Sequence, residues 1–201
     1  MVPMIESSSP RRVAAVLLAG GLSSRMGDFK QLMPFGRKTI VETCVETLLS
    51  SSVDDVVVVT GHRSDDVERV LAPYQVRIVR NTAYADGMST SVSAGVRALD
   101  PGDAVMVCLC DQPHLPRDVF EAVLGTYRSS EAAIVVPTIA GDTGHPVIFD
   151  ASLRDAILDV DPSVGLRSVT YANRDRTLRV PVDALGVLDD IDTQEDYERL
   201  R

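Results

Sequence analysis

Residues 13–31 constrain the fold of this chain more than any other stretch. An unbroken apolar run ends at Ala19 and is followed directly by a glycine pair. A short apolar run bounded by glycines predicts a strand that is buried on both faces of a sheet. Residues 20–31 then supply three glycines, two serines, Arg25 and Lys30. Glycines let the backbone turn its N–H groups toward a ligand, and two cations add charge, so we expect this loop to hold a polyanion such as a triphosphate.

The loop differs from the two commonest phosphate-binding loops. It lacks the Gly-Lys-Ser/Thr ending of a Walker A loop. Gly20 and Gly21 are adjacent, and no third glycine stands at the spacing of the dinucleotide fingerprint. A glycine pair after a strand is often only a turn, and surface Arg and Lys are often simply solvated. The residues alone therefore leave both a phosphate site and an ordinary turn open.

Apolar runs alternate with helical periodicities along the whole chain. Thr39 and Glu42 have the spacing of a capping box at the start of one helix. We expect a single α/β domain over residues 13–201, a three-layer doubly wound sheet, after a disordered leader at residues 1–12. The predicted strands are 13–19, 56–59, 76–79, 104–110, 132–136, 145–149 and 178–182; the predicted helices are 39–50, 64–71, 88–99, one that begins at Pro116, 152–158, 164–170 and a last one that begins at Thr193.

Composition excludes several classes of protein. The 201 residues carry a formal net charge of −9, which disfavours nonspecific binding to nucleic acid. Three cysteines, an odd number, indicate a reducing compartment, and we expect Cys108 and Cys110 to lie in the core. No run reaches the ~18 apolar residues of a membrane span, and residues 1–12 lack the apolar core of a signal peptide. We therefore expect a cytoplasmic protein with no membrane or nucleic-acid partner.

Asp111 comes directly after the predicted strand 104–110. Ligands of open α/β sheets bind beyond the carboxyl ends of the strands, and carboxylates are preferred ligands of Mg²⁺. Asp111 is therefore a candidate magnesium ligand, or else a cap for the helix that begins at Pro116. The hydroxyl residues of 88–92 are open to the same two interpretations, because the first turn of a helix binds either its own caps or an anion.

Five segments in this order resemble the signature of the MobA-like nucleotidyltransferases, a family that includes the molybdenum cofactor guanylyltransferase and cytidylyltransferase. The resemblance covers nearly the whole chain after the first dozen residues. The segments are Leu18-Ala19-Gly20-Gly21-x-Ser23-x-Arg25-Met26-Gly27-x-x-Lys30, Gly87-Met88-Ser89-Thr90-Ser91, Cys110-Asp111-Gln112-Pro113, Gly144-His145-Pro146-Val147 and Asp190-Ile191-Asp192-Thr193.

The resemblance implies a Rossmann-like nucleotidyltransferase fold whose mixed sheet has a late antiparallel strand. It implies that CTP or GTP donates a nucleoside monophosphate to the phosphate of molybdopterin, the organic part of the molybdenum cofactor, and that pyrophosphate leaves. The implied catalytic residues are Arg25, Lys30 and Asp111. The implied nucleotide contacts are Leu18, Ala19, Gly20, Gly21, Ser23, Arg25, Lys30, Gly87, Ser91 and Asp111; the implied acceptor contacts are Gln112, His145 and Arg167; and the implied ligands of Mg²⁺ are Asp111, Asp190 and Asp192.

The donor nucleotide stays open. The cytidylyltransferase branch usually has alanine at the position of Gly20, so this glycine favours GTP. The segments at 87–91 and 144–147 resemble the cytidylyltransferase branch, and Asp190 and Asp192 replace asparagines typical of the guanylyltransferase branch, so these features favour CTP.

Three other functions remain as alternatives. The chain could bind the molybdenum cofactor without catalysis and deliver it to a client, for which a molybdenum hydroxylase is the candidate. It could instead transfer a nucleotide to another phosphorylated small molecule. A dinucleotide-dependent dehydrogenase is disfavoured, because the glycine fingerprint is missing.

Overall fold

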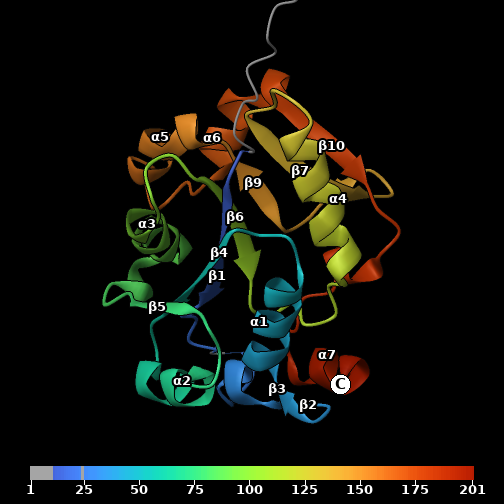
Figure 1. The fold of residues 1–201 in the computed structure, drawn as a ribbon. Helices are drawn as coiled ribbons and strands as arrows, with labels where there is room; N and C mark the ends of the chain where they lie inside the picture. The colour runs from blue at the N-terminus through green and yellow to red at the C-terminus, as the bar shows by residue number, and fades with distance from the viewer. Residues whose placement is uncertain (1–10, 24) are drawn as a thin grey trace, which may run out of the picture.

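The structure, a computed structural model, describes residues 11–23 and 25–201. Its centre is an eight-stranded sheet in the order β10-β7-β9-β6-β1-β4-β5, with β8 paired to β7 (Figure 1). The strands are β1 (Val13–Ala19), β4 (Asp55–Thr60), β5 (Arg77–Arg80), β6 (Ala104–Leu109), β7 (Ile134–Ile139), β8 (Asp142–Thr143), β9 (Val147–Phe149) and β10 (Thr177–Pro181); β2 (Pro34–Phe35) and β3 (Lys38–Thr39) form a separate hairpin.

β1 lies in the middle of the sheet, as its apolar sequence predicts. It pairs in parallel with β4 on one side and with β6 on the other, and Leu18 stands opposite Val59 and Leu109 in the two registers. β9 runs antiparallel between β6 and β7, and β8 is antiparallel to β7. The predicted mixed sheet with a late antiparallel strand is therefore confirmed.

Helices cover both faces of the sheet, which gives three layers (Figure 1). Val13, Ala15 and Leu17 pack in one core with buried residues of α1, α2, α4 and α7, and Ala14 and Val16 pack in a second core with α3, α5 and α6. The bounds are α1 (Ile40–Ser50), α2 (Ser64–Leu71), α3 (Met88–Ala98), α4 (Arg117–Arg128), α5 (Arg154–Leu158), α6 (Arg167–Ala172) and α7 (Gln194–Leu200).

Most predicted elements are present, with shifted ends where a turn competes with the helix or strand. The capping box of Thr39 and Glu42 opens α1 as expected. The predicted helix 164–170 begins only at Arg167, because Asp161 binds the N–H of Ser163 in a turn and Gly165 takes a φ of +72°. The predicted strand 132–136 is shifted to Ile134–Ile139.

The predicted leader, residues 1–12, falls mostly outside the described residues. Its last two residues contact the domain. Arg11 donates to the carbonyl of Tyr127 at 3.1 Å and forms an ion pair with Asp150, and Arg12 pairs with Asp103 at 3.0 Å. The contacts of the domain therefore reach back to Arg11. No described helix has the length and apolarity that crossing a membrane requires.

The order of the strands creates one point where the direction of the chain reverses. From β1 the chain moves outward through α1 to β4 and then through α2 to β5, and it returns through α3 to β6 on the other side of β1. After β1 the chain continues toward β4, and after β6 it continues toward β7 on the other side, so the two neighbouring strands lead away from each other at their carboxyl ends. Such a switch point is where open α/β sheets bind ligands.

Candidate active site

The loop after β1 is held in shape by its own polar side chains. Ser23 adopts a φ of +53°, and its hydroxyl accepts the N–H of Lys30 at 3.1 Å and donates to Gln31 Oε1 at 3.0 Å. The buried Gln31 side chain in turn donates to the carbonyl of Gly21 at 3.3 Å. Ser23 therefore shapes the loop from within, and Gln31, which the sequence analysis did not single out, does the same.

Gly20 lies against the end of β4. A Cβ atom built at Gly20 would lie 3.2 Å from the nitrogen of Gly61 and 3.3 Å from the carbonyl carbon of Thr60. At Gly61 a Cβ would come within 2.7 Å of the Gly20 carbonyl oxygen. The methyl group of an alanine at position 20 would therefore lie against the backbone of Thr60 and Gly61. Gly61 is a second required glycine that a lone Thr-Gly-His sequence does not reveal.

Lys30 joins the loop to the aspartates at the end of β6. Its ammonium donates to Asp111 Oδ2 at 2.9 Å, Asp192 Oδ1 at 3.2 Å and the carbonyl of Ile191 at 3.0 Å, and its side chain is only 12% exposed. Burial alone lowers the pKa of Lys30, but the charge of Asp111 and the bonds to both carboxylates outweigh it, so the pKa is raised. Lys30 is therefore a fixed positive charge at the switch point.

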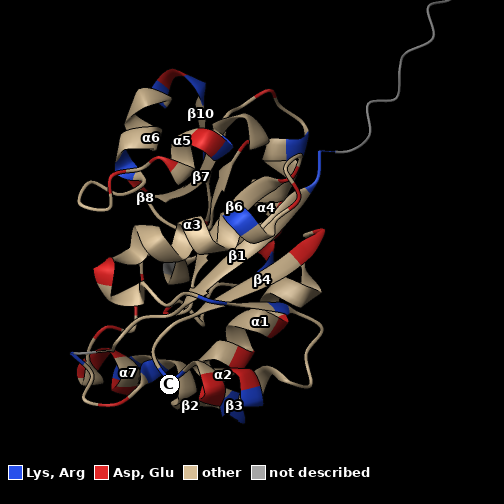
Figure 2. Ribbon diagram, turned by 90° about the vertical axis from the view of Figure 1, so that its left-hand side faces the viewer, with Lys and Arg blue, Asp and Glu red and all other residues tan. Residues whose placement is uncertain are grey.

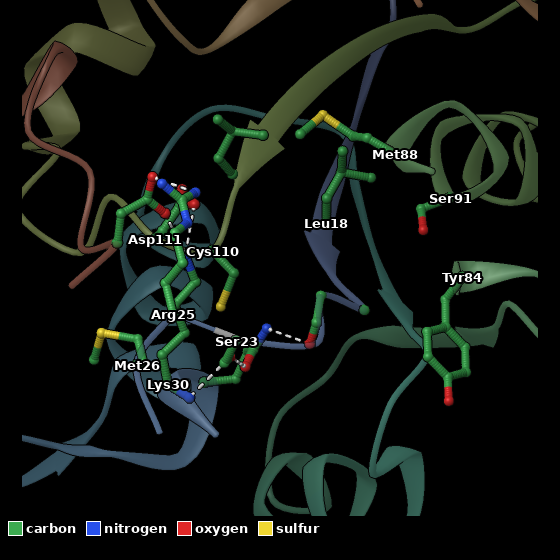
Figure 3. A pocket seen from close by; sticks show the side chains of 15 residues that line it. Leu18, Ser23, Arg25, Met26, Lys30, Tyr84, Met88, Ser91, Cys110 and Asp111 are labelled. Atoms are coloured by element: carbon green, nitrogen blue, oxygen red, sulfur yellow. Dashed lines mark hydrogen bonds and ion pairs between the residues drawn. The ribbon is translucent and has the colours of Figure 1, made fainter. Parts of the chain in front are cut away.

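Arg25 reaches the same cluster from the solvent side. Its side chain is 71% exposed and its Nη2 donates to Asp192 Oδ2 at 2.8 Å. Asp192 thus bridges the two cations of the loop, and Figure 3 shows Arg25 and Lys30 on the same side of the cavity as Asp111. The predicted catalytic residues Arg25, Lys30 and Asp111 are all brought together.

The environment of Asp111 excludes one of the two roles expected from the sequence, that of a helix cap. The helix after it begins at Arg117, and its N-cap Pro116 has no side-chain cap, so Asp111 does not cap it. Its side chain is 21% exposed and ion-paired with Lys30. Its second oxygen, Oδ1, is buried and accepts no hydrogen bond from any described residue. A buried carboxylate oxygen without a donor is a position where a cation fits.

The aspartates 111, 190 and 192 do not form a ready metal cage. Among the described residues no group of three or more His, Cys, Asp or Glu side chains could hold an ion. Asp192 faces Lys30 and Arg25, and Asp190 accepts a bond from the amide of Gln112 at 2.8 Å. Although Asp190 as a residue is exposed, partial burial of its carboxyl, followed by repulsion from Asp111, raises its pKa. Mg²⁺ usually takes one or two carboxylates and completes its shell with phosphates and water, so the donor set still fits that ion.

A cavity of about 220 Å³ opens between this cluster and the start of α3. It is lined on one side by Gly20, Gly21 and Lys30 and on the other by Tyr84 and Ser91, as Figure 3 shows for the labelled residues. Of the predicted nucleotide contacts, Leu18, Ser23, Arg25 and Asp111 also line it. Ala19 is instead fully buried.

The first turn of α3 is organised by Gly87 and Asn81. Gly87 is the N-cap with a φ of +117°, and no side-chain cap is present there. The buried amide of Asn81 donates to Thr90 Oγ1 at 2.8 Å and to Ser91 Oγ at 3.0 Å. Asn81, which no local sequence pattern indicates, therefore holds the hydroxyls of Thr90 and Ser91, and no side chain caps the helix.

The predicted acceptor residues separate. His145 and Arg167 line a second cavity, of about 790 Å³, that shares Met88 with the first. Burial lowers the pKa of His145. Gln112 is only 4% exposed, and its amide donates to Asp190 and to the carbonyl of Val187 at 3.2 Å, so in this structure it supports the 187–192 segment.

Comparison with known proteins agrees with this geometry. The sequence model of the MobA-like NTP transferase domain matches residues 15–177. The chain belongs to this family. It is therefore an enzyme of the nucleotidyltransferase class, and the resemblance noted in the sequence is confirmed.

Two curated relatives carry different names. The chain is 27% identical over 186 residues to the molybdenum cofactor cytidylyltransferase of Escherichia coli, covering 92% of this chain and 93% of that protein. It is 34% identical over 154 residues to the nicotine blue oxidoreductase of Paenarthrobacter nicotinovorans, covering 72% and 74%.

Solved structures match the fold. A nucleotidyl transferase from Methanothermobacter superposes with a TM-score of 0.82 at 28% identity, over 94% of this chain and 96% of that one. Rv0371c from Mycobacterium tuberculosis, solved as a complex with manganese, superposes with a TM-score of 0.76 at 20% identity, over 96% and 98%. The predicted Rossmann-like nucleotidyltransferase fold is therefore confirmed.

Proposed function

We propose that this enzyme transfers a nucleoside monophosphate from CTP, or from GTP, to the phosphate of molybdopterin and releases pyrophosphate. The observation that carries the proposal is the convergence of the loop after β1, the start of α3 and the carboxylate of Asp111 on one cavity at the switch point of the sheet. The cytidylyltransferase relative spans nearly the whole chain, which favours this reaction within the family.

In this proposal each residue has a role that follows from its position in the site. The backbone N–H groups near Gly20 and Gly21 approach the phosphates of the nucleotide, and Ser23 and Gln31 hold that backbone in place. Lys30 and Arg25 neutralise the charge that develops on the leaving pyrophosphate. Because a phosphate monoester is already a nucleophile, positioning and charge neutralisation are sufficient for the reaction.

Asp111, with Asp190 or Asp192, would hold Mg²⁺, which when bound neutralises negative charge on the phosphates. The unpartnered Oδ1 of Asp111 supports this assignment. In the structure Lys30 balances the charge of Asp111 and Asp192 from within the chain. We infer that the triphosphate competes with these two carboxylates for Lys30.

A thermal-shift panel of the four triphosphates, with and without Mg²⁺, tests the donor. A triphosphate present at a hundred times its Kd should add about 2.7 kcal/mol of stability. The preferred triphosphate is then incubated with molybdopterin, and pyrophosphate release is measured. Stabilisation by CTP with release only in the presence of molybdopterin supports the proposal, and the absence of release from all four triphosphates refutes it.

The controls separate the alternative functions. Tight binding of molybdopterin without pyrophosphate release indicates the noncatalytic accessory role. Release with another phosphorylated acceptor, and not with molybdopterin, means that the protein transfers a nucleotide as proposed but that its acceptor is a different molecule. Because one relative is named an oxidoreductase, NADH and NADPH are included as ligands, and we expect neither to stabilise the protein. Delivery of the product to a molybdenum hydroxylase stays a prediction.

A further inference from the structure

The charged side chains of the first cavity gather at one end of it. Among the described residues of its lining, the charged ones are Arg25, Lys30, Asp111 and Asp192. Ion pairs join all four into one cluster. Figure 3 shows Tyr84 on the other side of the cavity, across from Arg25 and Lys30. A donor whose triphosphate occupies the charged end therefore extends its base toward Tyr84.

The wall at the Tyr84 end carries no charge. Its described lining residues are Tyr84, Met88 and Ser91, and Figure 2 shows α3 nearly free of the charged residues that mark α2 and α7. The buried Ser91 hydroxyl accepts a hydrogen bond from Asn81 at 3.0 Å, and no described residue accepts its proton. An aromatic ring, a thioether and a free hydroxyl donor suit a nucleobase, which has flat faces and an edge with acceptors.

Tyr84 is held in place by its neighbours. A Cβ atom built at Gly61 would lie 2.6 Å from the Cβ of Tyr84 and 2.7 Å from its Cγ, so this side chain packs directly on the glycine. The Tyr84 ring lies 6.2 Å from the ring of His62, which is 5.5 Å from Phe29 in an edge-to-face arrangement. Phe29 directly precedes Lys30. This row of rings joins the base end to the phosphate loop, and Tyr84 cannot retreat toward Gly61.

The fixed ring matters because the cavity is small. Its volume of about 220 Å³ is below the range of about 300–1,000 Å³ that is typical of ligand pockets. Aromatic residues are scarce in this chain, with four Phe, five Tyr and no Trp, and Tyr84 alone among the described lining residues is aromatic. Cytosine has one ring and guanine has two. A ring that cannot move aside therefore leaves more suitable space for the smaller base.

We propose that Tyr84 is a specificity-determining residue of the donor site, whose ring packs against the nucleobase and selects a pyrimidine over a purine. This proposal rests on the proposed function, because it takes the first cavity as the site of the donor triphosphate. It goes further by naming the side chain that distinguishes CTP from GTP.

Calorimetric titration in the presence of Mg²⁺ tests the role of Tyr84 without requiring any reaction. The ligands are CTP, GTP and inorganic tripolyphosphate, which has the phosphates but no base and so reports on the charged end alone. The proteins are the wild type and the Tyr84→Ala, Tyr84→Leu, Tyr84→Phe and Tyr171→Ala variants. Tyr171 is the matched control, since it is an exposed tyrosine that does not line this cavity.

We expect the wild type to bind CTP about tenfold more tightly than GTP, or better. Tyr84→Ala should weaken CTP binding about five- to a hundredfold, the effect of removing an aromatic ring from a base, and reduce the preference for CTP at least about threefold. Its affinity for tripolyphosphate should not change, which also shows that the site is folded. Tyr84→Leu keeps apolar packing on Gly61 and replaces the alanine variant if that one does not fold. Tyr84→Phe and Tyr171→Ala should keep the preference of the wild type.

The outcomes distinguish this proposal from the proposed function. Pyrophosphate release with molybdopterin supports the proposed function whatever Tyr84 does. If the wild type binds CTP but releases no pyrophosphate, the proposed function fails, while the titrations still decide the role of Tyr84. A wild type that prefers GTP, an unchanged preference in the Tyr84→Ala and Tyr84→Leu variants, or an equal loss of affinity for tripolyphosphate overturns the role of Tyr84.

Discussion

Replacing Lys30 with methionine is the most informative perturbation of the candidate site. Methionine keeps most of the side-chain volume and removes the ammonium that lies 2.9 Å from Asp111 and 3.2 Å from Asp192. Removal of the positive charge of Lys30 should have two consequences, which can be measured separately. The loop loses a cation for the triphosphate, and two carboxylates lose the cation that neutralises them.

The burial of the ion pair and the loss of one charge at the site determine the expected decreases in stability and turnover. Exposed ion pairs contribute under about 1 kcal/mol, and breaking a buried pair costs about 3–5 kcal/mol. The side chains here are 12%, 21% and 34% exposed for Lys30, Asp111 and Asp192, so we expect a loss of about 1–3 kcal/mol in the free energy of unfolding. Turnover should fall by roughly 10²–10³, the effect of removing one preorganised charge donor.

The same substitution should strengthen the binding of a divalent cation in the absence of nucleotide. A unit charge about 4 Å from another contributes about 1 kcal/mol in water and about 4 kcal/mol at an effective dielectric of 20. The affinity for Mn²⁺, measured by the electron paramagnetic resonance of the free ion, should therefore rise at least about fivefold. Arg25→Gln is the matched control, since Arg25 is 71% exposed and contacts only Asp192 of the three aspartates; its effect should be smaller.

The pH dependence of the Lys30 effect has a definite sign. The pKa of Lys30 in the folded protein is raised above 10.5, so its contribution is fully present below the unfolded pKa and is lost as the pH rises through the folded value. The stability difference between the wild type and the methionine variant should therefore persist at neutral pH and shrink only in alkaline solution. A methionine variant with normal turnover and unchanged affinity for Mn²⁺ would refute the assigned role of Lys30.

Three further substitutions test other parts of the site. Asp111→Asn should reduce pyrophosphate release by several powers of ten and make stabilisation by the triphosphate largely independent of Mg²⁺; an active variant with an ordinary Mg²⁺ response overturns the metal assignment. Gly20→Ala should destabilise the protein by about 1–3 kcal/mol in chemical denaturation, because its methyl group meets the backbone of Gly61, and competition between CTP and GTP will show whether the loop also sets the donor. Asp190→Asn should raise the metal-free stability at neutral pH by a few tenths of a kcal/mol. The raised pKa of Asp190 means that its ionisation destabilises the fold, a penalty that is absent below the unfolded pKa and complete above the folded one; equal stabilisation at pH 3 contradicts this reason.

Local patterns in the sequence determined the elements of the fold. The apolar run of β1 can be satisfied only between two other strands, and the Thr39 and Glu42 capping box fixes the start of α1. The alternation of strands and helices then favours a parallel core, because a helical crossover returns the chain to the edge of the sheet from which it left. Ends that depend on a competing turn were shifted, as at Arg167, because turn and helix differ there by only a few hydrogen bonds.

The sequence also determined which charged residues reach the site, while their partners depended on tertiary structure. Asp111 and Lys30 were identified from their places after β6 and β1, but 81 residues separate them, so no local pattern reveals their ion pair. The supporting roles of Gln31 and Asn81, and the burial of Gln112, likewise depend on contacts made only in the fold. Separation in sequence is the physical reason: local preferences act over a few residues, whereas charge pairing and close backbone contact are set when distant segments pack together.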